Sequence, residues 1–140
     1  MKFQPILAAP LLALAVAAVA APPKTRYLDH SNANLIAEDA AIAVMNDNIP
    51  AKVWKIHPAS RYVFTSQVEG GMTSNGTCVI AARVILLPLS GAAKAALFRP
   101  QKTATAFDAL PNANIEQCRA LARDKLKEAT VAVVSAIVKT

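Results

Sequence analysis

Residues 73–89 read TSNGTCVIAARVILLPL, and this stretch decides the predicted fold. The pair Asn75-Gly76 is typical of a β-hairpin turn, because a two-residue type I′ turn needs positive φ at both central positions. Residues 77–87 are apolar on both faces, which is typical of a central strand that is covered on both sides. The residues before the turn, 61–69, alternate between apolar and polar side chains and are the expected partner strand.

The turn and the strand pattern conflict over register. A two-residue turn at Asn75-Gly76 would pair Val68 with Arg83 and leave Cys78 on the wetter face of the sheet. A shift of one residue reverses every side chain, and a glycine bulge at Gly70-Gly71 would supply that shift. We therefore predict a bulge there, with Arg83 facing away from the core. The residues then expected beneath the C-terminal helix are Tyr62, Phe64, Val68, Cys78, Ile80, Ala82 and Val84.

A long helix is predicted at the C-terminal end of the sequence. Asn114 is a suitable N-cap, and Gln117 stands three residues later, as in a capping box. At 100° per residue, one stripe of this helix is apolar and the opposite side carries charged residues. The stripe comprises Ile115, Cys118, Ala122, Leu126, Ala129, Val133, Ala136 and Ile137.

The remaining elements complete an α+β domain. We expect a helix over residues 34–46, a strand over 52–57, and one broken strand over 95–99 and 102–107, interrupted by Pro100 and lying at a sheet edge. The predicted order is α-β-β-β-β-α. It describes an antiparallel sheet of three to four strands, with an N-terminal helix and a long C-terminal helix packed on one face.

The first 20 residues have the pattern of a secretory signal peptide. Lys2 is followed by the apolar residues 6–19, and Ala18-Val19-Ala20 is a small-residue cleavage pattern. The predicted organisation is a signal peptide over 1–20, a flexible segment over 21–33 and one α+β domain over 34–140. The expected location is the periplasm or the exterior, with no membrane span in the mature chain. An uncleaved anchor is the alternative, although the apolar run is short for a span.

Cys78 and Cys118 are the only cysteines in the sequence. In an oxidising compartment, two cysteines tend to pair. A metal site would need further ligands at characteristic spacing, and a thiol nucleophile would need a base and a family signature. We therefore predict a Cys78–Cys118 disulfide, with no metal and no cofactor.

Positive charge is concentrated in residues 51–102, which contain seven Lys and Arg residues against Glu69 alone. A basic sheet face would attract lipid phosphates, acidic glycans or an acidic protein. Nucleic acid is not expected, given the compartment and the few aromatic residues available for stacking. The alternative is that these charges only solvate the surface. The candidate binding residues are Arg61, Arg83, Arg99 and Lys102.

No motif for catalysis stands out in the sequence. His57 and Ser60 are the best candidates for a hydrolase site, but neighbours in sequence do not make a catalytic array unless nucleophile, base and orienting group meet in space. The first interpretation is an exported, disulfide-stabilised, non-enzymatic module that binds a protein or acts as an inhibitor. The alternatives are a binder of anionic envelope ligands and a small hydrolase around His57. The edge strand from Leu97 to Phe107 could also accept a partner strand, unless Pro100 and its basic neighbours prevent pairing.

Overall fold

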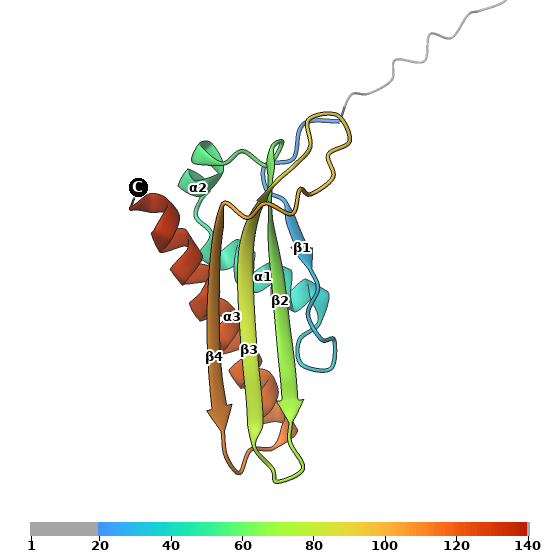
Figure 1. Ribbon diagram of the computed structural model, residues 1–140, viewed down its shortest axis with the longest axis vertical. Helices are drawn as coiled ribbons and strands as arrows, with labels where there is room; N and C mark the ends of the chain where they lie inside the picture. Colours follow the sequence, from blue (N-terminus) through green and yellow to red (C-terminus); the bar gives the residue numbers. More distant parts are fainter. Residues whose placement is uncertain (1–19, 140) are drawn as a thin grey trace, which may run out of the picture.

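The sheet has four strands, in the order β1 (Tyr27–Asp29), β2 (Tyr62–Met72), β3 (Cys78–Pro88) and β4 (Lys102–Leu110) (Figure 1). A computed structural model describes residues 20–139, so that most of the predicted signal peptide lies outside the described residues. Strands β2, β3 and β4 are antiparallel neighbours, as predicted, but β1 runs parallel to β2. The elements in chain order are β1 (Tyr27–Asp29), α1 (Glu38–Asn48), α2 (Ala51–Ile56), β2 (Tyr62–Met72), β3 (Cys78–Pro88), β4 (Lys102–Leu110) and α3 (Ile115–Val138).

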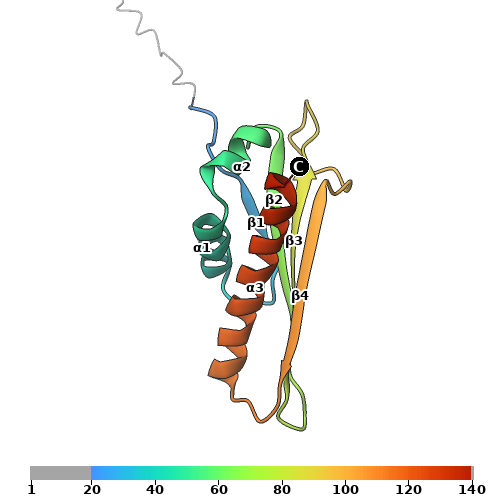
Figure 2. The same ribbon diagram turned by 90° about the vertical axis from the view of Figure 1, so that its left-hand side faces the viewer.

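Within residues 20–139, all the helices lie on one face of the sheet, and the opposite face carries no helix (Figure 2). Helix α3 crosses β3 and β4 and begins with the predicted capping box, in which Asn114 and Gln117 bond each other's backbone N–H. Its buried residues are Cys118, Ala122, Leu126, Ala129, Thr130, Val133 and Ile137. Two members of the predicted stripe, Ile115 and Ala136, are exposed.

The β2–β3 hairpin places the predicted residues in the core, but the predicted bulge is wrong. Val68 pairs with Ala82, and pairing continues one to one through Gly70 and Gly71. The one-residue shift comes from the turn itself, since Thr73 and Thr77 pair across a three-residue loop in which Gly76 has φ +77°. A three-residue loop ending in a left-handed glycine is a common hairpin connection.

Cys78 and Cys118 are joined, as predicted, with their Cα atoms 5.5 Å apart and both side chains fully buried. The disulfide ties the start of β3 to the first turn of α3. It lies at the end of the sheet that carries the β2–β3 hairpin loop (Figure 1).

Three local predictions are corrected. Residues 52–57 were expected to be a strand, but they lie in and just after helix α2. The buried residues of α2 are Val53 and Trp54, which are adjacent in the sequence, whereas a strand would place adjacent side chains on opposite faces. The helix expected from residue 34 begins only at Glu38, after a turn. Residues 95–99 form no strand, and only an isolated bridge joins Ala96 to Leu89. The element order is therefore β-α-α-β-β-β-α.

Candidate functional site

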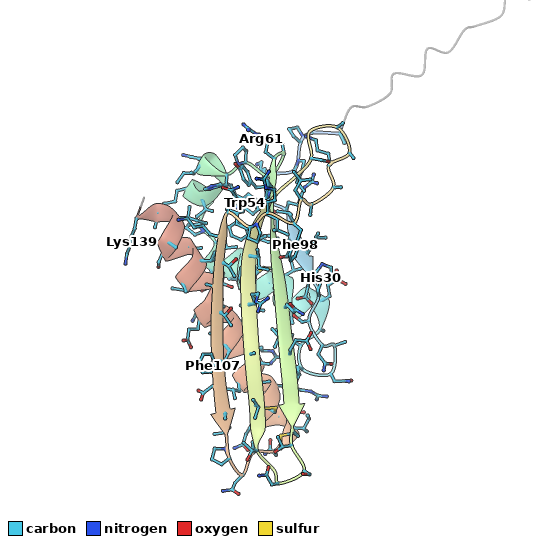
Figure 3. The ribbon with its side chains drawn as sticks, in the orientation of Figure 1. His30, Trp54, Arg61, Phe98, Phe107 and Lys139 are labelled. Atoms are coloured by element: carbon cyan, nitrogen blue, oxygen red, sulfur yellow. A yellow bond between two sulfur atoms is a disulfide. The ribbon has the colours of Figure 1, made fainter. Side chains whose placement is uncertain are left out.

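Segments that carry basic residues meet at one end of the molecule, where β2 begins, β3 ends and β4 begins (Figure 1). Arg61 and Lys139 mark this end in Figure 3. The basic residues come from six separate parts of the chain: the segment before β1, α2, the turn before β2, the loop over residues 89–101, the start of β4, and the C-cap of α3. We call this region the basic end. Its residues are Lys24, Arg26, Lys52, Lys55, Arg61, Lys94, Arg99, Lys102 and Lys139.

The charges of the basic end are not neutralised by the carboxylates of the described chain. The ion pairs within residues 20–139 join Arg119 to Glu116, and Lys125 to Asp108 and Glu128, all of them away from this end. Lys94 donates to the backbone carbonyl of Ser60 at 3.0 Å, which holds the 89–101 loop against the turn before β2 without cancelling its charge. These bases therefore give the basic end a strongly positive electrostatic potential.

The 89–101 loop adds exposed apolar surface to the same end. Leu97 and Phe98 lie between Lys94 and Arg99 in the sequence. The Phe98 side chain is 89% exposed and borders a hollow over the helix-free face, together with Leu28, Thr65 and Ile85. On α2, Ile56 is 55% exposed beside Lys55. Segments that bind the interface of an anionic membrane typically combine exposed apolar residues with basic residues in this way.

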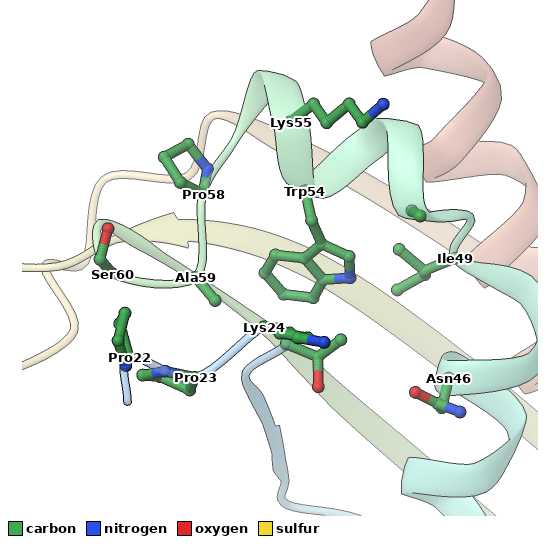
Figure 4. Close-up of a pocket in the computed structure, with 12 residues that line it drawn as sticks. Pro22, Pro23, Lys24, Asn46, Ile49, Trp54, Lys55, Pro58, Ala59 and Ser60 are labelled. Carbon is green, nitrogen blue, oxygen red and sulfur yellow. The ribbon is translucent and has the colours of Figure 1, made fainter. Parts of the chain in front are cut away.

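A pocket of about 680 Å³ opens at the basic end between α2 and the segment before β1 (Figure 4). Its walls are apolar, with the indole of Trp54 between Ile49 on one side and Ala59 and Pro58 on the other. Lys24 reaches across beneath the indole. Pockets of 300–1,000 Å³ with apolar walls and few polar groups are typical of small-molecule sites.

An aromatic cluster fixes the orientation of Trp54. Its ring meets those of Tyr27 and Phe64 edge to face, with centroids 5.6 and 5.3 Å apart. Burial raises the pKa of the Tyr27 hydroxyl; the nearby Trp54 indole N–H opposes this shift, and Asp47 adds to it. The indole Nε1 lies close to that hydroxyl but makes no hydrogen bond of ordinary geometry. Trp54 is therefore a rigid wall of the pocket.

His57 does not form a catalytic array with the predicted Ser60. Its ring packs against Tyr62, with centroids 4.8 Å apart, and its buried Nδ1 has no partner among the described residues. Burial, and next the charge of Lys102, lowers the pKa of His57.

A polar cluster ties β1 and the turn after it to β2. In this cluster the Asp29 carboxylate accepts hydrogen bonds from the hydroxyl groups of Ser31 and Ser66, both at 2.6 Å.

The four predicted binding residues do not form one patch. Arg83 lies on the helix-free face of the sheet, opposite Gln67 and Thr105, as predicted. Arg61, Arg99 and Lys102 lie together at the basic end. Sequence reasoning missed the contribution of Lys24, Lys55 and Lys94, because residues this far apart in the chain meet only in the fold.

No group of three or more His, Cys, Asp or Glu residues in positions 20–139 is arranged to hold a metal ion. In the same range, no helix combines the length and the apolar character needed to cross a bilayer.

Comparison with known proteins gives weak structural likenesses only. No protein-family model matches the sequence, and no curated protein matches it. A candidate lipoprotein from Caulobacter crescentus CB15 is 12% identical, with 81% of this chain and 84% of that chain covered and a TM-score of 0.41. A PelC variant from Paraburkholderia phytofirmans, solved as a dodecamer, is 12% identical, with 81% and 90% covered and a TM-score of 0.40. Likenesses of this size carry no argument about function.

Proposed function

We propose that this protein is an exported, non-catalytic module that docks through its basic end on an anionic lipid surface of the cell envelope. The observation that carries the proposal is the gathering of bases without ion pairs around an exposed apolar loop. Export is supported by the leader pattern of residues 1–20 and by the Cys78–Cys118 disulfide, since disulfides persist in oxidising compartments.

The energetics favour a lipid surface. A Lys or Arg near an anionic leaflet contributes about 1 kcal/mol, so that a few of these residues acting together give useful affinity. Phe98 is 89% exposed in the free protein, and its burial on binding would contribute roughly 1.5–3 kcal/mol. Acidic glycans would engage the bases but would leave Leu97 and Phe98 in water. The lipid surface therefore uses both features of the basic end.

Vesicle sedimentation tests the proposal. The mature chain, residues 21–140, should bind phosphatidylglycerol vesicles and not phosphatidylcholine vesicles, and binding should weaken steeply with salt, because the Debye length falls from about 10 Å at 0.1 M to about 3 Å at 1 M. Arg99→Glu and Phe98→Ser should each weaken binding. Arg83→Glu and Phe107→Ser are matched controls on the helix-free face, where Phe107 is 79% exposed.

Three outcomes would contradict the proposal. The first is no difference between anionic and neutral vesicles. The second is an equal loss in the control variants. The third is a preference for a soluble acidic polysaccharide that Phe98→Ser leaves unchanged, which would assign the basic end to glycan.

The helix-free face supports a second candidate function, the binding of a protein partner. Val79 and Phe107 are 44% and 79% exposed there, on neighbouring strands, and β4 is an edge strand along its whole length. Crosslinking of exported protein in cells tests it. A discrete adduct that Phe107→Ser abolishes and Phe98→Ser does not would support this face as the working surface.

A further inference from the structure

We propose that the pocket beside Trp54 binds the hydrocarbon chain of a single-chain anionic amphiphile, with Lys24 holding its acidic head group and Lys55 adding positive charge at the rim. The inference rests on the proposed function, because the pocket opens at the basic end. It adds a small-molecule site to a surface whose proposed docking depends on basic residues and an exposed apolar loop.

The lining of the pocket matches a hydrocarbon chain. Ile49, Ala51, Pro58 and Ala59 contribute carbon surface around the flat face of Trp54 (Figure 4). The indole is 9% exposed and is held by two edge-to-face contacts, so that this wall is formed before any ligand arrives. A preformed wall reduces the ordering cost of binding.

The positive charges at the pocket favour a ligand with a negative charge. Lys24 and Lys55 both border it, and neither side chain takes part in an ion pair or hydrogen bond within residues 20–139. Lys24 lies beneath the indole, and Lys55 extends from α2 above it (Figure 4). An acidic head group at the mouth would contact Lys24 while its chain lies along the indole. Lys55, whose ammonium group points away from the indole, would add attraction over a longer distance (Figure 4).

The open shape of the pocket favours an amphiphile over a wholly apolar molecule. The pocket has a wide mouth at the surface, and Lys24, Asn46 and Ser60 line it together with the apolar residues. One end of a ligand would therefore stay in water, as the head group of a fatty acid or lysophospholipid does. A neutral apolar molecule would leave both lysines unpaired.

Trp54 is the only tryptophan in the sequence, so its fluorescence reports on the pocket directly. Dodecanoate carrying bromine on its terminal carbon, used below its aggregation concentration, should quench Trp54 with saturation. Bromododecanol and a brominated dodecyltrimethylammonium ion should quench much more weakly. The variant Lys24→Glu/Lys55→Glu should weaken dodecanoate binding about tenfold, because it replaces the attraction of Lys24 and the longer-range attraction of Lys55 with repulsion. Lys127→Glu on the exposed side of α3 is the matched control.

The outcomes separate this inference from the proposed function. If the protein still sediments with anionic vesicles while bromododecanoate leaves Trp54 unquenched, the pocket inference fails and the docking function stands. Equal quenching by the three probes would also overturn it, as would equal weakening by the Lys127→Glu control. If quenching is retained and vesicle binding is absent, the pocket is a site for a free amphiphile and the docking function fails. Ala51→Leu, which narrows the pocket from its exposed rim, should weaken quenching without unfolding the protein.

Discussion

Removal of the disulfide should cost this protein a large part of its stability. The bond closes a loop of 40 residues between the start of β3 and the first turn of α3. By chain entropy, such a crosslink stabilises the folded state by about 4 kcal/mol. The surroundings hold the native geometry without the bond, because the Asn114–Gln117 capping box begins α3 and the Ala113 N–H donates to the Gly76 carbonyl at 3.0 Å. The loss of stability should therefore come mainly from the unfolded chain, which gains conformational entropy when the crosslink is removed.

Urea denaturation of residues 21–140 measures this effect. The variant Cys78→Ala/Cys118→Ala should unfold at a midpoint lower by about 2–3 M urea, for a slope near 1.5 kcal/mol per M. Reductant should shift the wild type by a similar amount and leave the double variant unchanged. A shift below about 1 kcal/mol in both cases would refute the reasoning, because the 40-residue loop would then be restricted in the unfolded chain without the bond.

Three further predictions concern single positions. Gly70→Ala should destabilise the protein by about 2 kcal/mol or more beyond Gly71→Ala, because both glycines have positive φ but only a Cβ at Gly70 would lie 2.0 Å from the Val79 carbonyl oxygen; equal urea midpoints would contradict this. Asn114→Ala should cost about 1 kcal/mol by removing the cap of α3, seen as a lower thermal midpoint, and Asn114→Asp should retain most of it. Because burial lowers the pKa of His57 in the fold, the unfolded chain takes up the proton first, so stability should fall as pH drops below about 6.5 and His57→Gln should flatten that dependence; identical pH profiles of the two proteins would exclude His57 as the cause.

The parts of the fold that local chemistry determines were predictable. The capping box, the buried stripe of α3 and the disulfide depend on spacing, periodicity and compartment, each of which is visible in the sequence. The core face of β3 was predicted correctly for a wrong reason, since the register shift arises in the loop that ends at Gly76 and not at Gly70-Gly71. The alternation of side chains identifies the buried face of a strand, but it does not show which residues of the hairpin cause the shift in register.

The parts that depend on distant pairing were not predictable. The three residues of β1, Tyr27–Asp29, become a strand only by pairing in parallel with β2, and no local pattern marks them. Helix α2 is too short for its period to be distinguished from the alternation of a strand. The candidate site was the least predictable part, because its residues are far apart in the sequence. Lys24 precedes β1, Trp54 lies in α2 and Lys102 begins β4, and only the folded chain brings them to one end.

The described chain enters and leaves the molecule at the same end. Residues 20 and 139 both lie near the lysines and arginines that we propose as the docking surface (Figure 1). An affinity tag or fluorescent protein fused at either side would stand between that surface and its target, and immobilising the protein through such a fusion would hide the region under study. An epitope inserted at Ser74 and Asn75, in the exposed loop between β2 and β3, would instead project from the opposite end and leave access free.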